Sequence, residues 1–183
     1  MSHALVIVDI QNDYFPGGTM ELAGADAAAA QAAQVLVAFR AKRMPVIHIQ
    51  HIATRPGATF FLPGTTGAAI HASVQPAAGE SVFTKHFPNA FRETPLLDFL
   101  RSQQITQLSF VGMMSHMCID TSVRAATDLG FSCSVAHDAC ATKTLSFNGA
   151  EVPAAQVQAA YMAGLNGSFA KVVSGADLVA GLN

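Results

Sequence analysis

Six short runs of apolar residues, separated by stretches with helical periodicity, restrict the fold of this chain most strongly. Most of these runs lack a regular alternation of polar and apolar residues, which is typical of strands covered on both faces. The predicted strands cover residues 4–9, 45–50, 81–85, 108–112, 132–137 and 170–173. The predicted helices cover residues 26–43, with Asp26 as N-cap, 94–103, 116–129, 153–165 and 176–182. This order predicts an α/β fold: a Rossmann-like three-layer sandwich with a central six-stranded, mostly parallel sheet flanked by helices.

The chain of 183 residues fits one domain, residues 1–183. It has neither an internal repeat nor a low-complexity linker. Residues 55–76 break the strand–helix pattern, because they are rich in proline and glycine and contain Phe60 and Phe61. A loop this long in a compact domain is often a lid or binding loop, and we predict that role here.

Composition excludes several classes of protein. No apolar run approaches the ~20 residues of a membrane span, and the first residues lack the pattern of a signal peptide. The net charge of −2 comes from scattered charges, so nucleic acid is not an expected partner. The three cysteines form no C-x-x-C pair, which favours a reducing cytoplasm over a disulfide framework. The 51% hydrophobic content and mean hydropathy of +0.35 predict a full core and buried subunit contacts.

Three reactive side chains stand at the carboxyl ends of predicted strands, where sites gather in open α/β sheets. Asp9 ends the first strand, Lys85 ends the third, and Cys118 follows the fourth. Cys118 falls in the first turn of a predicted helix, where the helix dipole favours a thiolate and so lowers the thiol pKa. Free backbone N–H groups at that turn could also stabilise an oxyanion. Cys118 is therefore a candidate nucleophile.

Each of these residues also has a structural interpretation. Cys118 could be a small buried side chain in a packed helix, and we favour that interpretation for Cys133 and Cys140. Asp9 could cap a turn, and Lys85 could be solvated.

The sequence resembles the isochorismatase-like cysteine hydrolase family, which includes nicotinamidases and N-carbamoylsarcosine amidohydrolases. The matching segments are ALVIVDIQNDYFPGG, SVFTKHFPNAF and FVGMMSHMCIDTSVRAATDLGFSCSVAHDACAT. The resemblance implies a catalytic triad in which Cys118 is the nucleophile, Asp9 the general acid and base, and Lys85 the cation beside both. It further implies a cis peptide bond between Met113 and Met114, and an oxyanion hole formed by the backbone amides of Met114 and Cys118.

These roles predict a hydrolase that cleaves a small amide-type C–N bond through a thioester. The substrate is a small molecule, and no step requires a metal or an organic cofactor. Nicotinamidases of this family bind a metal through an Asp-x-His pattern, but this chain has Ile49-Gln50-His51 at that point. Because the aspartate is missing, we predict no metal site, and we interpret His48, His51 and His71 as structural or surface residues.

Five residues are candidates for contact with the substrate because they follow the predicted strands or lie in the expected binding loops. Aromatic rings there would suit a small planar or apolar substrate, although each could equally belong to the core. His116 could instead cap the helix. The candidates are Gln11, Phe15, Phe60, Phe87 and His116.

Two other functions remain open. Some members of the resembled family have no cysteine and hydrolyse a vinyl ether, as isochorismatases do. The chain could also be a catalytically silent binding or redox protein on the same fold. For any of these functions we expect a homo-oligomer, a dimer or a tetramer.

Overall fold

The computed structural model describes residues 2–182 and contains a six-stranded sheet with the order β3-β2-β1-β4-β5-β8. All neighbouring strands in this sheet are parallel, so the predicted fold class is confirmed. The strands lie close to the predicted positions. They are β1 Ser2–Val8, β2 Val46–His51, β3 Ser81–Lys85, β4 Ile105–Met113, β5 Ser132–Ala141 and β8 Lys171–Val173.

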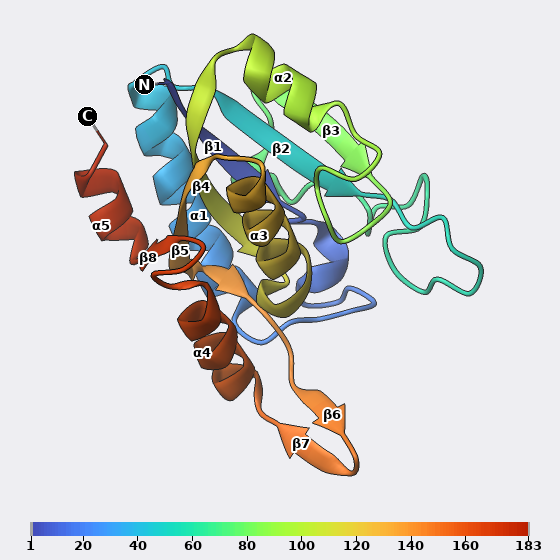
Figure 1. Cartoon of the computed structure of the whole chain (residues 1–183). Helices are drawn as coiled ribbons and strands as arrows, with labels where there is room; N and C mark the ends of the chain where they lie inside the picture. Colours follow the sequence, from blue (N-terminus) through green and yellow to red (C-terminus); the bar gives the residue numbers. More distant parts are fainter. Residues whose placement is uncertain (1, 183) are drawn as a thin grey trace.

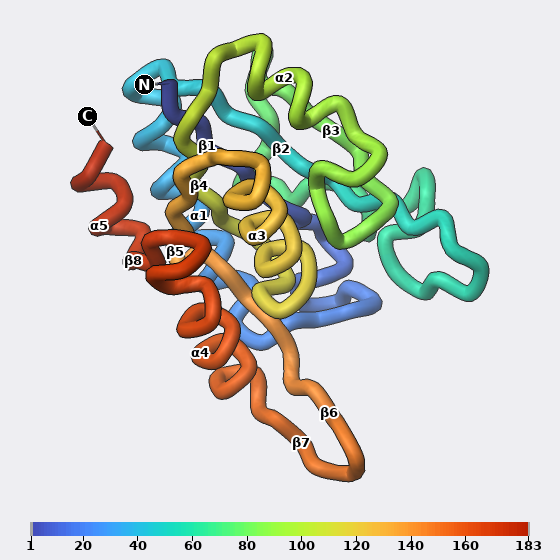
Figure 2. Tube along the Cα trace, viewed as in Figure 1, coloured from blue at the N-terminus to red at the C-terminus, as the bar shows by residue number. Residues whose placement is uncertain are grey.

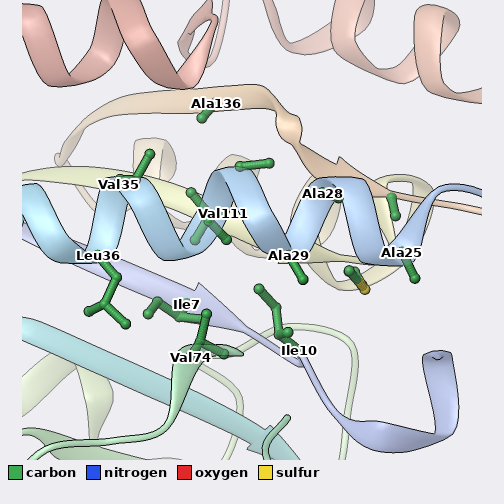
Figure 3. Close-up of a cluster of buried hydrophobic side chains, with 14 of the residues drawn as sticks. Ile7, Ile10, Ala25, Ala28, Ala29, Val35, Leu36, Val74, Val111 and Ala136 are labelled. Carbon is green, nitrogen blue, oxygen red and sulfur yellow. The ribbon is translucent and has the colours of Figure 1, made fainter. Parts of the chain in front are cut away.

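Helices cover both faces of the sheet (Figure 1). On one face, α1 (Ala25–Ala41) and α5 (Gly175–Ala180) share a buried cluster with Leu5 and Ile7 of β1. Figure 3 shows part of this cluster, in which Val35 and Leu36 of α1 lie over the strands. On the other face, α2 (Leu96–Ser102), α3 (Asp120–Asp128) and α4 (Ala154–Leu165) belong to a cluster with the intervening residues Ala4, Val6 and Val8.

The burial of both faces explains why residues 4–8 of the central strand β1 are all apolar. Side chains alternate between faces along a strand, so a strand between two helical layers needs apolar residues at every position. Residues 4–8 of β1 are each at most 2% exposed. Burial of this kind contributes about 25 cal/mol for each Å² of apolar surface.

Two details of the helices differ from the predictions. Asp26 is not the N-cap of α1; Gly24 takes that position with a left-handed φ of 72°, and Asp26 lies in the first turn. There its carboxylate still interacts favourably with the helix dipole. The predicted helix 116–129 is divided into a π-helical turn, η3 (Ser115–Ile119), and α3.

A small antiparallel hairpin was missed from the sequence. Strands β6 (Leu145–Phe147) and β7 (Ala150–Val152) are joined by Asn148 and Gly149, both with positive φ. Asn-Gly is a strong signal for a two-residue hairpin turn, but each strand has only three residues. Figure 2 shows the hairpin extending away from the sheet before α4 begins.

Short 3₁₀ turns complete the structure: η1 (Asn12–Tyr14) and η2 (Ala72–Val74). No helix among residues 2–182 is long and apolar enough to cross a membrane.

Candidate active site

Asp9, Lys85 and Cys118 come together at the carboxyl ends of β1, β3 and β4. The Lys85 Nζ atom lies 2.7 Å from Asp9 Oδ2 and donates a hydrogen bond to Cys118 Sγ at 3.2 Å. Asp9 and Lys85 are completely buried, and Cys118 is 6% exposed. The interpretation of Lys85 as a solvated side chain is therefore wrong. A buried ion pair of this kind, in contact with a thiol, is a candidate catalytic centre.

The backbone around the site explains how the sequence sets this geometry. Gly112 near the end of β4 has a φ of +132°, and a Cβ atom there would lie 2.0 Å from the carbonyl oxygen of Val8. Only glycine permits this close approach of β4 to β1. Asp9 itself has a positive φ of 50°. The Met113–Met114 peptide bond is cis, and η3 follows it with Cys118.

The protonation of Cys118 differs from the prediction. Burial, with Asp9 nearby, raises the pKa of the Cys118 thiol, while Lys85 acts in the opposite direction. The expected lowering by the helix terminus is therefore wrong, because desolvation of the thiolate dominates. Burial lowers the pKa of Lys85, but Asp9 and Cys118 outweigh it and the net shift is upward. The resting site is a neutral thiol beside an Asp–Lys ion pair.

His51 is a fourth member of the site that was not predicted as such. Its Nδ1 atom lies 3.0 Å from Lys85 Nζ, and burial followed by Lys85 lowers its pKa to about 4. Gln11 holds its backbone on both sides: Gln11 Oε1 accepts from the N–H of His51 at 2.7 Å, and Gln11 Nε2 donates to its carbonyl at 2.8 Å. The sequence feature that could have identified His51 is its position at the end of β2, between the strands that supply Asp9 and Lys85.

The residues do not fit a metal site built from the three histidines. His48 bonds to Glu80 at 2.8 Å, and His71 stacks on Phe15 and contacts Ser73.

Within residues 2–182, the only group of three potential ligands is Asp9, His51 and Cys118, with ligand atoms within 4.8 Å of one another. The Lys85 ammonium contacts all three of these side chains. A metal ion would therefore compete with a cation that the chain itself supplies.

A cavity of about 480 Å³ opens above Cys118. Its lining is mainly aromatic and apolar, with Tyr14, Phe60, Phe87 and Met117 among the contributors. Arg55, His51 and His86 also line the cavity. A cavity of this size accommodates a small molecule.

The candidate binding residues divide into two groups. Phe60 and Phe87 line the cavity. Gln11 is buried and supports His51, Phe15 is buried against His71, and His116 bonds to Thr142 at 2.6 Å. These last three are absent from the cavity lining among the described residues.

The loop predicted at residues 55–76 reaches the cavity through Phe60 and is anchored beside it. The buried Asp13 accepts a hydrogen bond from the N–H of Phe61 at 2.6 Å, and its own N–H donates to the Gly67 carbonyl at 2.9 Å. A Cβ atom at Gly67 would lie 2.1 Å from the Asp13 carboxylate. The loop therefore depends on a polar contact with the segment that follows β1.

Comparison with known proteins identifies one family. Residues 3–177 match the isochorismatase domain family. An uncharacterised isochorismatase family protein of Bacillus subtilis, YddQ, is 48% identical over 94% of this chain and 96% of its own length. A crystal structure from Oleispira antarctica, provisionally named an isochorismatase hydrolase, has a TM-score of 0.95 and 50% identity, covering 98% of this chain and 97% of that one.

Less similar relatives are named for several different activities. The secreted isochorismatase effector Isc1 of Verticillium dahliae is 32% identical over 95% of this chain and 88% of its own length. Streptothricin hydrolase of Streptomyces noursei is 34% identical over 76% of this chain and 54% of its own length. A nicotinamidase/pyrazinamidase and ureidoacrylate amidohydrolases also match, at 27–29% identity.

Proposed function

This chain belongs to the isochorismatase family of hydrolases, and on that premise we propose that it cleaves a small amide-type C–N bond through a Cys118 thioester. The observation that carries the proposal is the buried contact of Lys85 with both Asp9 and Cys118, beneath the cavity. Relatives named nicotinamidase and ureidoacrylate amidohydrolase support C–N chemistry.

The charges of the site suit this reaction. When the thiol attacks the carbonyl carbon, its proton passes to the Asp9 carboxylate. The negative charge moves from Asp9 to the carbonyl oxygen, so the total charge of the site does not change. We assign the backbone N–H groups of Met114 and Cys118 to the developing oxyanion. Asp9 then returns the proton to the leaving nitrogen. Water then attacks the thioester carbon as Asp9 takes one of its protons. The C–S bond breaks, the acid product leaves, and Asp9 returns the proton to the sulfur of Cys118.

The cavity indicates the kind of substrate. Its aromatic and apolar lining would accommodate a small planar molecule, and the lining includes no carboxylate among the described residues. We therefore propose a neutral or anionic substrate. The reaction needs a reduced thiol, so we propose the cytoplasm as its setting.

The test is a panel of amides, ureides and isochorismate, assayed with the wild type and with Cys118→Ala. We expect ammonia or amine release by the wild type, a thioester adduct on Cys118 in intact-mass spectra, and at least ~10³-fold slower turnover by the variant. Cys133→Ala, at a half-buried cysteine outside the cavity, is the matched control and should retain activity.

Other outcomes would point elsewhere. Consumption of isochorismate by Cys118→Ala would replace the proposal with vinyl ether hydrolysis. Inactivity of the wild type on every compound would favour a binding or redox protein.

A further inference from the structure

The Lys85 ammonium has three N–H groups, and the site provides three acceptors for them. These are Asp9 Oδ2 at 2.7 Å, His51 Nδ1 at 3.0 Å and Cys118 Sγ at 3.2 Å. Because Lys85 is completely buried, each of its donors needs a partner inside the protein. His51 therefore completes the coordination of the ammonium.

This contact determines the tautomer of His51. An ammonium donates hydrogen bonds and accepts none, so the Nδ1 atom that faces it must carry a lone pair. The low pKa of His51, about 4, keeps the ring neutral near pH 7. A neutral imidazole without a proton on Nδ1 carries it on Nε2.

The second ring nitrogen is available to the cavity. His51 lines the cavity beside Cys118, and no residue in the described range 2–182 bonds to its Nε2 atom. A ring nitrogen of His51 and the sulfur of Cys118 lie within 4.8 Å of each other. Because His51 and Cys118 line the same cavity, one small molecule can contact the His51 ring and present a carbonyl carbon to Cys118.

We propose that His51 is a positioning residue: Lys85 holds its ring in the Nε2–H form, and this N–H donates a hydrogen bond to the substrate. The inference rests on the proposed function for the reaction, and it narrows the substrate class. The substrate carries a second acceptor, such as a ring nitrogen or a further carbonyl oxygen, close to the scissile amide. His51 then orients the amide without taking part in proton transfer.

The first test needs no substrate. In ¹⁵N NMR spectra of histidine-labelled protein, we expect the His51 ring to be a neutral Nε2–H tautomer from pH 5 to pH 8. The His51→Asn variant assigns the signal by its disappearance. A protonated ring, or a proton on Nδ1, at pH 7 would overturn the proposal even if amide hydrolysis were demonstrated.

The second test separates the two nitrogens with matched variants. The oxygen of Asn can replace Nδ1 as acceptor for Lys85, whereas the amide of Gln can replace the Nε2–H donor. We expect His51→Asn to keep the pH profile of Cys118 alkylation by iodoacetamide, and to raise KM about 10-fold for an amide that the panel identifies. His51→Gln should change the alkylation profile and retain most of the substrate affinity.

One kinetic result would overturn the proposal, and another would overturn only the proposed function. Unchanged KM and kcat in His51→Asn would show that Nε2–H makes no contact with the substrate. If no amide in the panel reacts, the proposed function fails, while the NMR experiment still decides the tautomer.

Discussion

At the scale of single residues, the site contains two buried side chains of opposite charge. Asp9 and Lys85 compensate each other, and removal of one partner leaves an unpaired charge in the interior. We expect Lys85→Met to destabilise the protein by about 3 kcal/mol and to reduce turnover at least ~100-fold. The double variant Asp9→Asn/Lys85→Met should recover most of the stability and none of the activity.

Urea unfolding of the wild type, both single variants and the double variant measures this coupling directly. Lys85→Met with the stability of the wild type would mean that the pair is not buried as described. Additive destabilisation in the double variant would mean that the two side chains do not interact.

Sequence reasoning predicted that Asp9, Lys85 and Cys118 lie close together, because parallel strands present their carboxyl ends at one edge of a sheet. It missed His51 because a single histidine has many structural uses, and only the contact with Lys85 shows which applies. It gave the wrong direction for the pKa of Cys118 because burial is a tertiary property. Helix position alone does not reveal the desolvation that dominates here.

At the scale of elements, one ion-pair network joins α1, β2 and the turn before β3. Glu80 accepts hydrogen bonds from Arg40 at 2.7 and 2.8 Å, from His48 at 2.8 Å and from the Ala77 N–H at 2.9 Å. Burial alone would raise the pKa of Glu80, but these donors outweigh it and lower the pKa to about 2. The ionised carboxylate therefore stabilises the packing of the helix against the sheet.

This shift predicts a specific loss of stability in acid. A carboxyl group whose pKa is lowered on folding stabilises the protein above its unfolded pKa, 4.5, and the stability is lost as the pH falls towards about 2. We expect the contribution to be about 2 kcal/mol after allowance for solvent screening at Arg40. Glu80→Gln should lose it at pH 7 and show a flatter dependence between pH 4.5 and pH 2.

Denaturant midpoints across this pH range provide the measurement. Asp128→Asn, at an exposed carboxyl group, is the control and should follow the wild type. An unchanged acid profile in Glu80→Gln would assign acid sensitivity to other groups.

The strands and helices were largely predictable because their hydrophobic periodicity reflects the two layers that cover the sheet. Boundaries were less predictable. The N-cap of α1 is Gly24 in a left-handed conformation. The sequence favoured Asp26 instead, because aspartate is a more usual N-cap residue. The β6–β7 hairpin has mainly exposed residues, so it lacks the apolar pattern from which the other strands were identified.

At the scale of the whole molecule, apolar side chains are exposed on the hairpin that precedes α4. Phe147 in β6 is 76% exposed, and Val152 in β7 is 37% exposed. The twelve residues of α4 include no charged side chain. A two-stranded hairpin is marginally stable alone, so contact with a second copy of the chain would stabilise it.

We therefore expect the chain to form a homo-oligomer through this hairpin. Burial of Phe147 contributes about 2 kcal/mol for each copy, so Phe147→Ser should weaken association about 30-fold for each copy at the interface. Sedimentation equilibrium of the wild type and the variant measures this change. Val37→Ser, at a residue of α1 that is 63% exposed, is the matched control and should associate as the wild type does. A monomeric wild type, or equal association of Phe147→Ser and Val37→Ser, would contradict the assignment, because the hairpin would then be stable without a partner.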